Sequence, residues 1–226
     1  MIQTLTRKAI MAGVAILTLA SCLSFNAAAA TVITGTLKNK AGHPLTGLAL
    51  LEKGELHNNM WYGGSLVDKN GHFKIKVGAG GQYGLHVYSS GYIYSPQAVK
   101  VETGKTAEVN FVLVAEPTRA NDPVIKQISF SSDKLTMEVN DPNQNLGPQV
   151  LAFNSATGKT YALAPPQSVH DLKSKFPNGT YQLPLEGSDS GNKNRNWHFV
   201  VANHECNTTD IVSYPHKPGR PKLVQE

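Results

Sequence analysis

Cysteine is nearly absent from this chain of 226 residues, which has only Cys22 and Cys206. Cys22 lies in an N-terminal segment with the features of an export signal, where it would be removed or modified. No disulfide within the mature chain can then form, even in an oxidising compartment. The stability of the protein must therefore come from apolar cores.

Motifs for catalysis and nucleotide binding are also lacking. The sequence contains no G-x-S-x-G elbow, no H-E-x-x-H, no phosphate-binding glycine-rich loop and no C-x-x-C. The formal charge of +5 falls to +3 when Arg7 and Lys8 are removed, and no Lys/Arg cluster occurs. We therefore expect a protein that is not an enzyme, needs no cofactor and does not bind nucleic acid.

The first 30 residues have the features of an export signal. The apolar run AIMAGVAILTLA (9–20) follows Arg7 and Lys8, and Ala28-x-Ala30 fits the small-x-small cleavage rule. A dozen apolar residues are too few to span a bilayer, which takes about 20. The stretch LASC also resembles the bacterial lipobox, in which Cys22 is lipidated. Both alternatives place the protein outside the cytoplasm, in the periplasm, secreted, or on the outer membrane as a lipoprotein.

Apolar residues after the signal alternate in short runs bounded by Gly, Asn, Asp and Pro. In HFKIKV (72–77) every second residue is apolar, and in YGLHVY (83–88) Leu85 faces one way while His86 and Tyr88 face the other. No stretch keeps a helical apolar period for three turns. The pattern predicts an all-β protein with two tandem β-sandwich domains after the export signal.

The alternation also predicts which substitutions disturb the core. Phe111 shares a face with Val109 and Leu113, so Phe111→Ala should cost about 3 to 5 kcal/mol of unfolding free energy. On a solvated outer face, His86→Ala should be close to neutral.

A break in the pattern at AEPTRANDP (115–123) separates the two predicted domains. We expect a signal peptide at 1–30, a first sandwich at 31–115, a linker at 116–123 and a second sandwich at 124–202. Periodicity is lost from Asn203 onward, so residues 203–226 are predicted to be a loose C-terminal tail.

Residues 32–114 resemble the carboxypeptidase regulatory-like domain, a transthyretin-like β-sandwich often found in exported bacterial proteins. The resemblance rests on four segments: GTLKNKAGHPLTGLAL (35–50), DKNGHFKIKV (68–77), GQYGLHVYSSGY (81–92) and VKVETGKTAEVNFVL (99–113). It implies a sandwich fold and a non-catalytic role. Transthyretin-like hydrolases carry a histidine and arginine set and a characteristic C-terminal tetrapeptide, and neither has an equivalent here.

Residues 124–202 are similar to a bacterial immunoglobulin-like domain, on the strength of NGTYQLPLEGSDSGNKNRNWHFVV (178–201). In the matching motif Asp189, Gly191 and Asn192 supply a turn, and a closing strand contains Phe199. The resemblance implies a second β-sandwich.

Aromatic side chains are the main candidates for a binding surface. Trp61 and Tyr62 lie in the loop-like stretch NNMWYGG, while His86, Tyr88 and Tyr94 occupy positions that the core does not use. Aromatic faces supply contact area and stack on sugar rings or peptide groups. We predict that these five residues form an at least partly exposed surface for an envelope protein or glycan. The alternative is that Trp61 and Tyr92 pack inward and the others cover the edge of the sandwich.

A metal site is the competing hypothesis. His204, Cys206 and His216 could supply nitrogen, sulfur and nitrogen to Cu or Zn in a periplasmic metal-binding protein. No fourth ligand lies at motif spacing. The alternative is that these residues belong to the tail and Cys206 is a spare thiol able to pair between chains.

Overall fold

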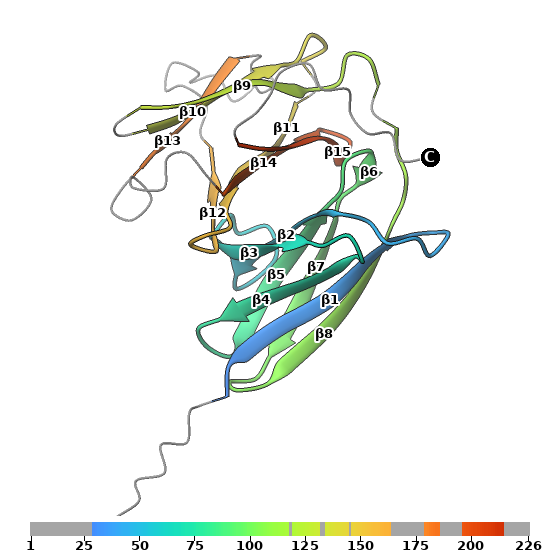
Figure 1. The fold of residues 1–226 in the computed structure, drawn as a ribbon, viewed down its shortest axis with the longest axis vertical. Helices are drawn as coiled ribbons and strands as arrows, with labels where there is room; N and C mark the ends of the chain where they lie inside the picture. The colour runs from blue at the N-terminus through green and yellow to red at the C-terminus, as the bar shows by residue number, and fades with distance from the viewer. Residues whose placement is uncertain are drawn as a thin grey trace, which may run out of the picture.

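The computed structural model describes residues 29–117, 119–131, 134–144, 146–163, 179–185 and 196–214. All regular structure in these residues is β-strand, which confirms the predicted all-β fold (Figure 1). The strands are β1 (Thr31–Asn39), β2 (Gly47–Lys53), β3 (Trp61–Val67), β4 (His72–Val77), β5 (Gly81–Tyr88), β6 (Tyr92–Ile93), β7 (Ser95–Val101), β8 (Thr106–Leu113), β9 (Val124–Phe130), β10 (Lys134–Asn140), β11 (Leu146–Asn154), β12 (Lys159–Ala162), β13 (Gly179–Pro184), β14 (Trp197–Asn203) and β15 (Asn207–Ser213).

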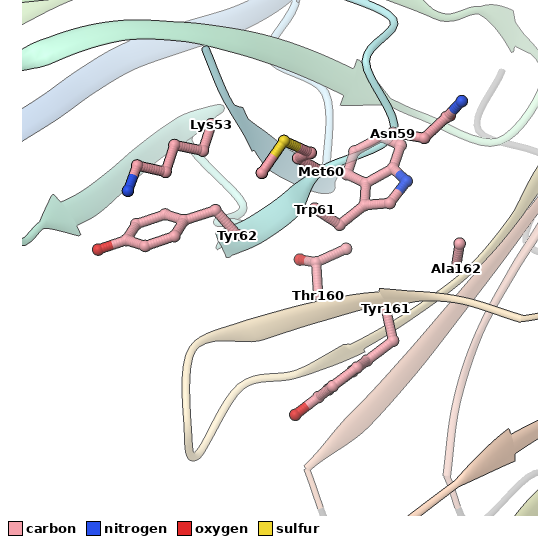
Figure 2. Close-up of a pocket in the computed structure, with 8 residues that line it drawn as sticks. All are labelled: Lys53, Asn59, Met60, Trp61, Tyr62, Thr160, Tyr161 and Ala162. Atoms are coloured by element: carbon pink, nitrogen blue, oxygen red, sulfur yellow. The ribbon is translucent and has the colours of Figure 1, made fainter.

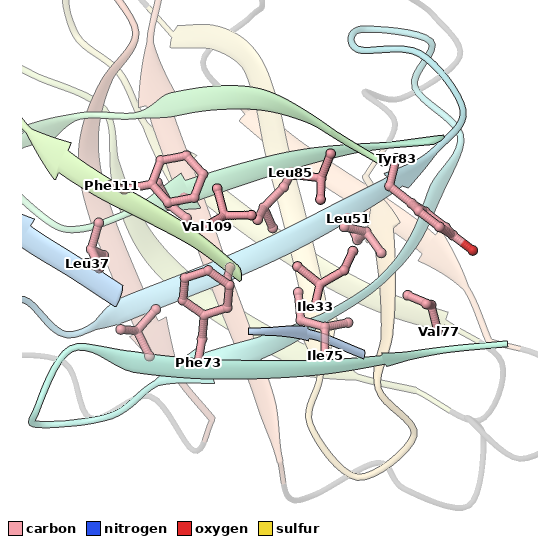
Figure 3. Packing of buried hydrophobic residues seen from close by; sticks show 14 of the residues in the cluster. Ile33, Leu37, Leu51, Phe73, Ile75, Val77, Tyr83, Leu85, Val109 and Phe111 are labelled. Carbon is pink, nitrogen blue, oxygen red and sulfur yellow. The ribbon is translucent and has the colours of Figure 1, made fainter. Parts of the chain in front are cut away.

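The first half of the chain forms a sandwich of two sheets. One has the strand order β4-β1-β8 and the other β3-β2-β5-β7. β1 pairs antiparallel with β4 and parallel with β8. The alternating apolar residues of these strands meet between the sheets, as Figure 3 shows for Phe73, Leu85 and Phe111. The predicted inward face of these strands is thereby confirmed, because a strand that presents every second residue to its partner sheet buries only that set.

The second half forms another pair of sheets. Their strand orders are β13-β10-β9 and β12-β11-β14-β15-β6. A separate apolar core lies between them and includes Met137, Tyr181, Trp197 and Phe199. The short strand β6 comes from the first half of the chain, yet it pairs with β15.

The prediction of a loose tail after Asn203 is wrong for residues 207–213, which form β15. Four successive polar residues at the start of this strand, from Asn207 to Asp210, are buried. Two of these side chains bond to the backbone that leads into β9: the Thr209 hydroxyl donates to the Pro123 carbonyl at 2.6 Å, and Asp210 Oδ2 accepts the Ile125 N–H at 3.0 Å. A strand whose buried positions are polar carries no apolar alternation, so the sequence pattern missed it.

The predicted linker is held to the second sandwich at its C-terminal end. Asp122 and Pro123 are buried. The Asp122 carboxylate accepts the Arg119 N–H at 2.7 Å and lies 3.4 Å from the Asn203 amide nitrogen, which donates to it. The boundaries of the two domains remain a prediction, but this end of the connection is anchored.

A third apolar core joins the two halves. The outer face of the sheet β3-β2-β5-β7 packs on the outer face of the sheet β12-β11-β14-β15-β6, so four sheets follow one another in Figure 1. We call this cluster the interface core; its buried members are Leu48, Leu50, Tyr88, Tyr94, Leu151, Phe153, Val200 and Ala202. The outer face of the first sandwich is therefore covered where β2 and β5 cross its centre.

The prediction that His86, Tyr88 and Tyr94 are exposed is wrong. Their side chains are 1%, 0% and 7% exposed. For β5 the alternation itself holds, because His86 and Tyr88 point away from the core of the first sandwich, but the second half covers that face. The expectation that His86→Ala is neutral rested on a solvated face and loses its basis.

Candidate ligand-binding groove

A groove of about 410 Å³ opens between the start of β3 and the strand β12 (Figure 2). Two segments that lie about 100 residues apart in the chain form its two sides. It is lined by Lys53, Asn59, Met60, Trp61, Tyr62, Thr160, Tyr161 and Ala162. The groove therefore exists only because the two halves pack together.

Two glycines let β3 approach the second half closely. The Gly64 N–H donates to the Gly158 carbonyl at 3.1 Å, and the Thr160 hydroxyl donates to the Gly63 carbonyl at 2.8 Å. A Cβ atom on Gly63 would lie 3.0 Å from the Gly158 carbonyl oxygen, and one on Gly64 would lie 3.2 Å from Phe153 Cε2, both in the second half. A side chain at either position would therefore crowd the second half at the groove.

Trp61 links the groove to the protein interior. Its side chain is half-buried and packs against the interface core. The ring centroid lies 5.1 Å from that of His86. In Figure 2 the indole stands between the loop residue Asn59 and the strand that carries Thr160. One part of the ring is thus held by buried neighbours while another part borders the groove.

The other aromatic residues of the groove differ in orientation. Tyr62 is 38% exposed, and its hydroxyl accepts the Gly78 N–H at 3.1 Å. Tyr161 turns its ring away from Trp61 in Figure 2, and the ring centroid lies 5.9 Å from that of Trp197 in the second core. Trp61 and Tyr62 therefore contribute the aromatic surface of the groove, and Met60, 60% exposed, adds an apolar rim.

A buried polar pair lies directly behind Trp61. His86 Nε2 is 3.0 Å from Glu52 Oε2, and both side chains are 1% exposed. The carboxylate also accepts the N–H groups of His57 at 2.8 Å and Asn59 at 3.0 Å. Because an ionised carboxylate only accepts hydrogen bonds, the His86 Nε2–H donates to it. His86 Nδ1 then has no hydrogen-bond partner among the described residues.

Burial controls the ionisation of this cluster. The loss of hydration lowers the pKa of His86, an effect that the bond to Glu52 opposes. Burial raises the pKa of Tyr88, whose hydroxyl has no partner within the described part of the chain. Burial and the bond with Cys206 raise the pKa of Tyr94. His86 is therefore a neutral imidazole at neutral pH, and both tyrosines keep their protons.

The described residues give no support to the metal hypothesis. His204 is exposed, whereas Cys206 is partly buried, packs on the interface core and bonds to Tyr94. His216 and Cys22 lie outside the described residues. Among the residues that the structure describes, no group of three His, Cys, Asp or Glu side chains is arranged to hold a metal ion.

Sequence reasoning found Trp61 and Tyr62 but missed the rest of the groove. Thr160 and Ala162 belong to a strand of the other half, and no local pattern links them to β3. Glu52 looks like a surface residue beside Lys53 at the end of a strand. The sequence offered one indication that Glu52 is buried: it directly follows the apolar run LALL (48–51), whose residues are expected to be buried.

Comparisons with known proteins give no family assignment. No protein-family model matches the chain, and no curated protein sequence matches it. The resemblances to the carboxypeptidase regulatory-like and immunoglobulin-like domains therefore remain predictions. In the described ranges, no helix is long and apolar enough to cross a membrane.

Several solved structures are similar to parts of the chain. GBS52, the minor pilin of Streptococcus agalactiae, shares 21% identity over 40% of this chain and 47% of the pilin, with a TM-score of 0.32. The chain thus spans about half the length of that protein. A DUF3823 family protein from Parabacteroides merdae shares 14% identity over 82% of this chain and 97% of its own, with a TM-score of 0.28. A proposed carbohydrate-binding protein from Bacteroides uniformis shares 12% identity over 80% and 96% of the two chains, with a TM-score of 0.29.

Proposed function

We propose that this protein is an exported, non-catalytic binding protein that recognises carbohydrate through the groove between β3 and β12. The observation that carries the proposal is Trp61, whose ring borders the groove while His86 and the interface core hold it in place. An aromatic ring that is already immobilised loses little conformational entropy when a flat apolar face stacks on it. The predicted export signal would deliver this groove to the cell envelope.

The size of the groove favours a sugar over a folded protein partner. A volume of about 410 Å³ lies in the range of roughly 300 to 1,000 Å³ that is usual for small-molecule sites. A stable protein interface needs about 800 Å² on each partner. The exposed apolar residues near the groove, such as Met60 and Leu66, are single side chains rather than a face of that size.

Polar groups at the groove suit a hydroxyl-rich ligand. Asn59 offers an amide, which both donates and accepts, and Lys53 offers an ammonium donor. The Thr160 hydroxyl is buried and already donates to the Gly63 carbonyl, so it joins the two sides of the groove and is not offered to a ligand. Sugar hydroxyls can pair with Asn59 and Lys53, while the apolar face of the ring contacts Trp61.

The test is calorimetric titration of the full chain with oligosaccharide fragments prepared from bacterial envelope polysaccharides. Trp61→Ala should weaken binding about tenfold or more, the effect of losing one aromatic contact. A matched pair lies on or beside β3: Met60 lines the groove, whereas Leu66 is 41% exposed outside it. Met60→Ala should weaken binding, and Leu66→Ala should leave it unchanged.

Two results would overturn the proposal. If a glycan binds all three variants as tightly as it binds the natural chain, its binding site lies outside the groove. If no glycan binds but an envelope protein is retained by the natural chain and lost with Met60→Ala, the groove serves a protein partner.

A further inference from the structure

The loop between β2 and β3 has an unusual backbone. His57 and Asn59 have φ values of 64° and 57°, in the left-handed region that residues with a side chain seldom adopt. Such a conformation persists only where the surroundings impose it. The next two residues along the chain are Met60 and Trp61 at the edge of the groove, so the path of this loop decides where they stand.

Glu52 bonds to the same two residues. Its Oε2 accepts the His57 N–H and its Oε1 accepts the Asn59 N–H. The imidazole of His86 donates to Oε2 and holds the carboxylate in place. Both carboxylate oxygens are therefore occupied by the loop, and the charge is stabilised by these three donors in a site that solvent does not reach.

We propose that Glu52 is the positioning residue of the groove: its buried carboxylate holds the backbone at His57 and Asn59 so that Met60 and Trp61 form the ligand-facing edge. This inference rests on the proposed function, because it takes that groove as the binding site. Glu52 does not touch the ligand. It acts through the loop, and His86 acts through Glu52.

Because both oxygens of Glu52 accept bonds from the loop, a side chain of the same shape with only one acceptor oxygen cannot replace it. In Glu52→Gln, the amide keeps one acceptor oxygen and replaces the other by a donor NH₂. If the oxygen faces His57, the NH₂ meets the Asn59 N–H, and the reverse orientation leaves His57 without an acceptor. Either way one strained backbone position loses its bond.

A matched control exists in the next turn of the chain. Asp68 accepts the N–H groups of both Asn70 and His72 with the single oxygen Oδ1. In Asp68→Asn, the amide oxygen can take the place of Oδ1 and keep both bonds. The same acid-to-amide change is therefore expected to open the loop at Glu52 but not the turn at Asp68.

The experiment is amide hydrogen exchange on the full chain, read residue by residue by NMR. Glu52→Gln should speed exchange at His57 or Asn59 by roughly tenfold or more, the effect of losing a hydrogen bond to a charged acceptor. Exchange at Leu37, in the core of the first sandwich, should not change. Asp68→Asn should leave exchange at Asn70 and His72 within about twofold of the natural chain.

Acrylamide quenching of tryptophan fluorescence gives a second readout. Trp197 is fully buried, so the accessible signal comes from half-buried Trp61. Glu52→Gln should raise quenching, and Trp61→Phe should remove the rise. Unchanged exchange and quenching in Glu52→Gln would overturn the inference, as would faster exchange of equal size at Leu37, because that is global destabilisation.

These readouts need no ligand, so the two proposals can fail separately. Local loosening of the loop in a protein that binds none of the oligosaccharides supports the positioning role and overturns the proposed function. Oligosaccharide binding that Trp61→Ala weakens but Glu52→Gln leaves unchanged, with the loop intact, supports the function and overturns the positioning role.

Discussion

The two faces of β5 are both buried, but by different parts of the molecule. Tyr83, Leu85 and Val87 face the core of their own sandwich, whereas His86 and Tyr88 face the second half of the chain. The first face is apolar apart from one tyrosine hydroxyl, which donates to the Ala79 carbonyl at 2.8 Å. The second carries an imidazole nitrogen and a hydroxyl without partners in the described residues.

The difference shows what each kind of burial requires of a sequence. A face packed on the other sheet of its own sandwich needs a regular apolar repeat, because that repeat sets the register of the strands. A face packed on a separate unit needs only enough apolar area to dock, and it can include polar groups that bond locally, as His86 bonds to Glu52. The outer face of β5, with His86 and Tyr88, therefore looks like a polar surface when the sequence is read alone.

The largest effect is expected from removing one buried aromatic residue at the interface core or in the core of the first sandwich. Tyr88→Ala and Phe111→Ala should each lower the free energy of unfolding by about 3 to 5 kcal/mol, the usual loss for a buried aromatic ring. Tyr88→Phe should leave it unchanged or raise it slightly, since the Tyr88 hydroxyl has no partner among the described residues. Urea denaturation measures all three. A loss above about 1 kcal/mol in Tyr88→Phe would mean that the hydroxyl is bonded, for example to a buried water.

The next prediction uses two adjacent, fully buried leucines. Leu51 faces the core of the first sandwich, and Leu50 faces the interface core. If the two halves unfold together, Leu50→Ala and Leu51→Ala should both cost about 2 to 5 kcal/mol in one shared urea transition. A small loss for Leu50→Ala, or two separate transitions, would show that the halves are independent domains that only touch.

How much the sequence could predict follows the same division. Phe73, Ile75 and Val77 alternate with polar residues, so their strand and its buried face were predictable from local pattern. β15 was not, because its buried Thr209 and Asp210 are satisfied by backbone groups more than 80 residues away along the chain. The groove was half predictable: Trp61 and Tyr62 stand out as adjacent aromatic residues, although they begin strand β3 and do not lie in a loop, but Thr160 reaches them only through the packing of the two halves.

The smallest expected effect is a loss of stability in mild acid that arises at the interface face. Burial lowers the pKa of His86 below its usual value of 6.5. Between these two pKa values the unfolded chain binds a proton that the folded chain does not, so stability falls as the pH falls. The contribution of His86 is complete above about pH 6.5 and is lost progressively below it, at up to about 1.4 kcal/mol per pH unit.

Replacing His86 by glutamine should reduce this acid sensitivity. The amide of the new side chain can still donate to Glu52, but it does not titrate, and the other groups facing this site stay in place: His57, Tyr88 and Tyr94. Urea midpoints measured from pH 7.5 to pH 5 should fall less steeply for His86→Gln than for the natural chain. His198 provides the comparison, because burial also lowers its pKa. It lies near the start of β14 in the second half, where its side chain bonds to Ser155 and Ser213. If His198→Gln reduces the fall of the urea midpoint with pH and His86→Gln does not, the acid-sensitive group lies in the second half. The buried face of β5 then makes no contribution to the pH dependence of stability in this range.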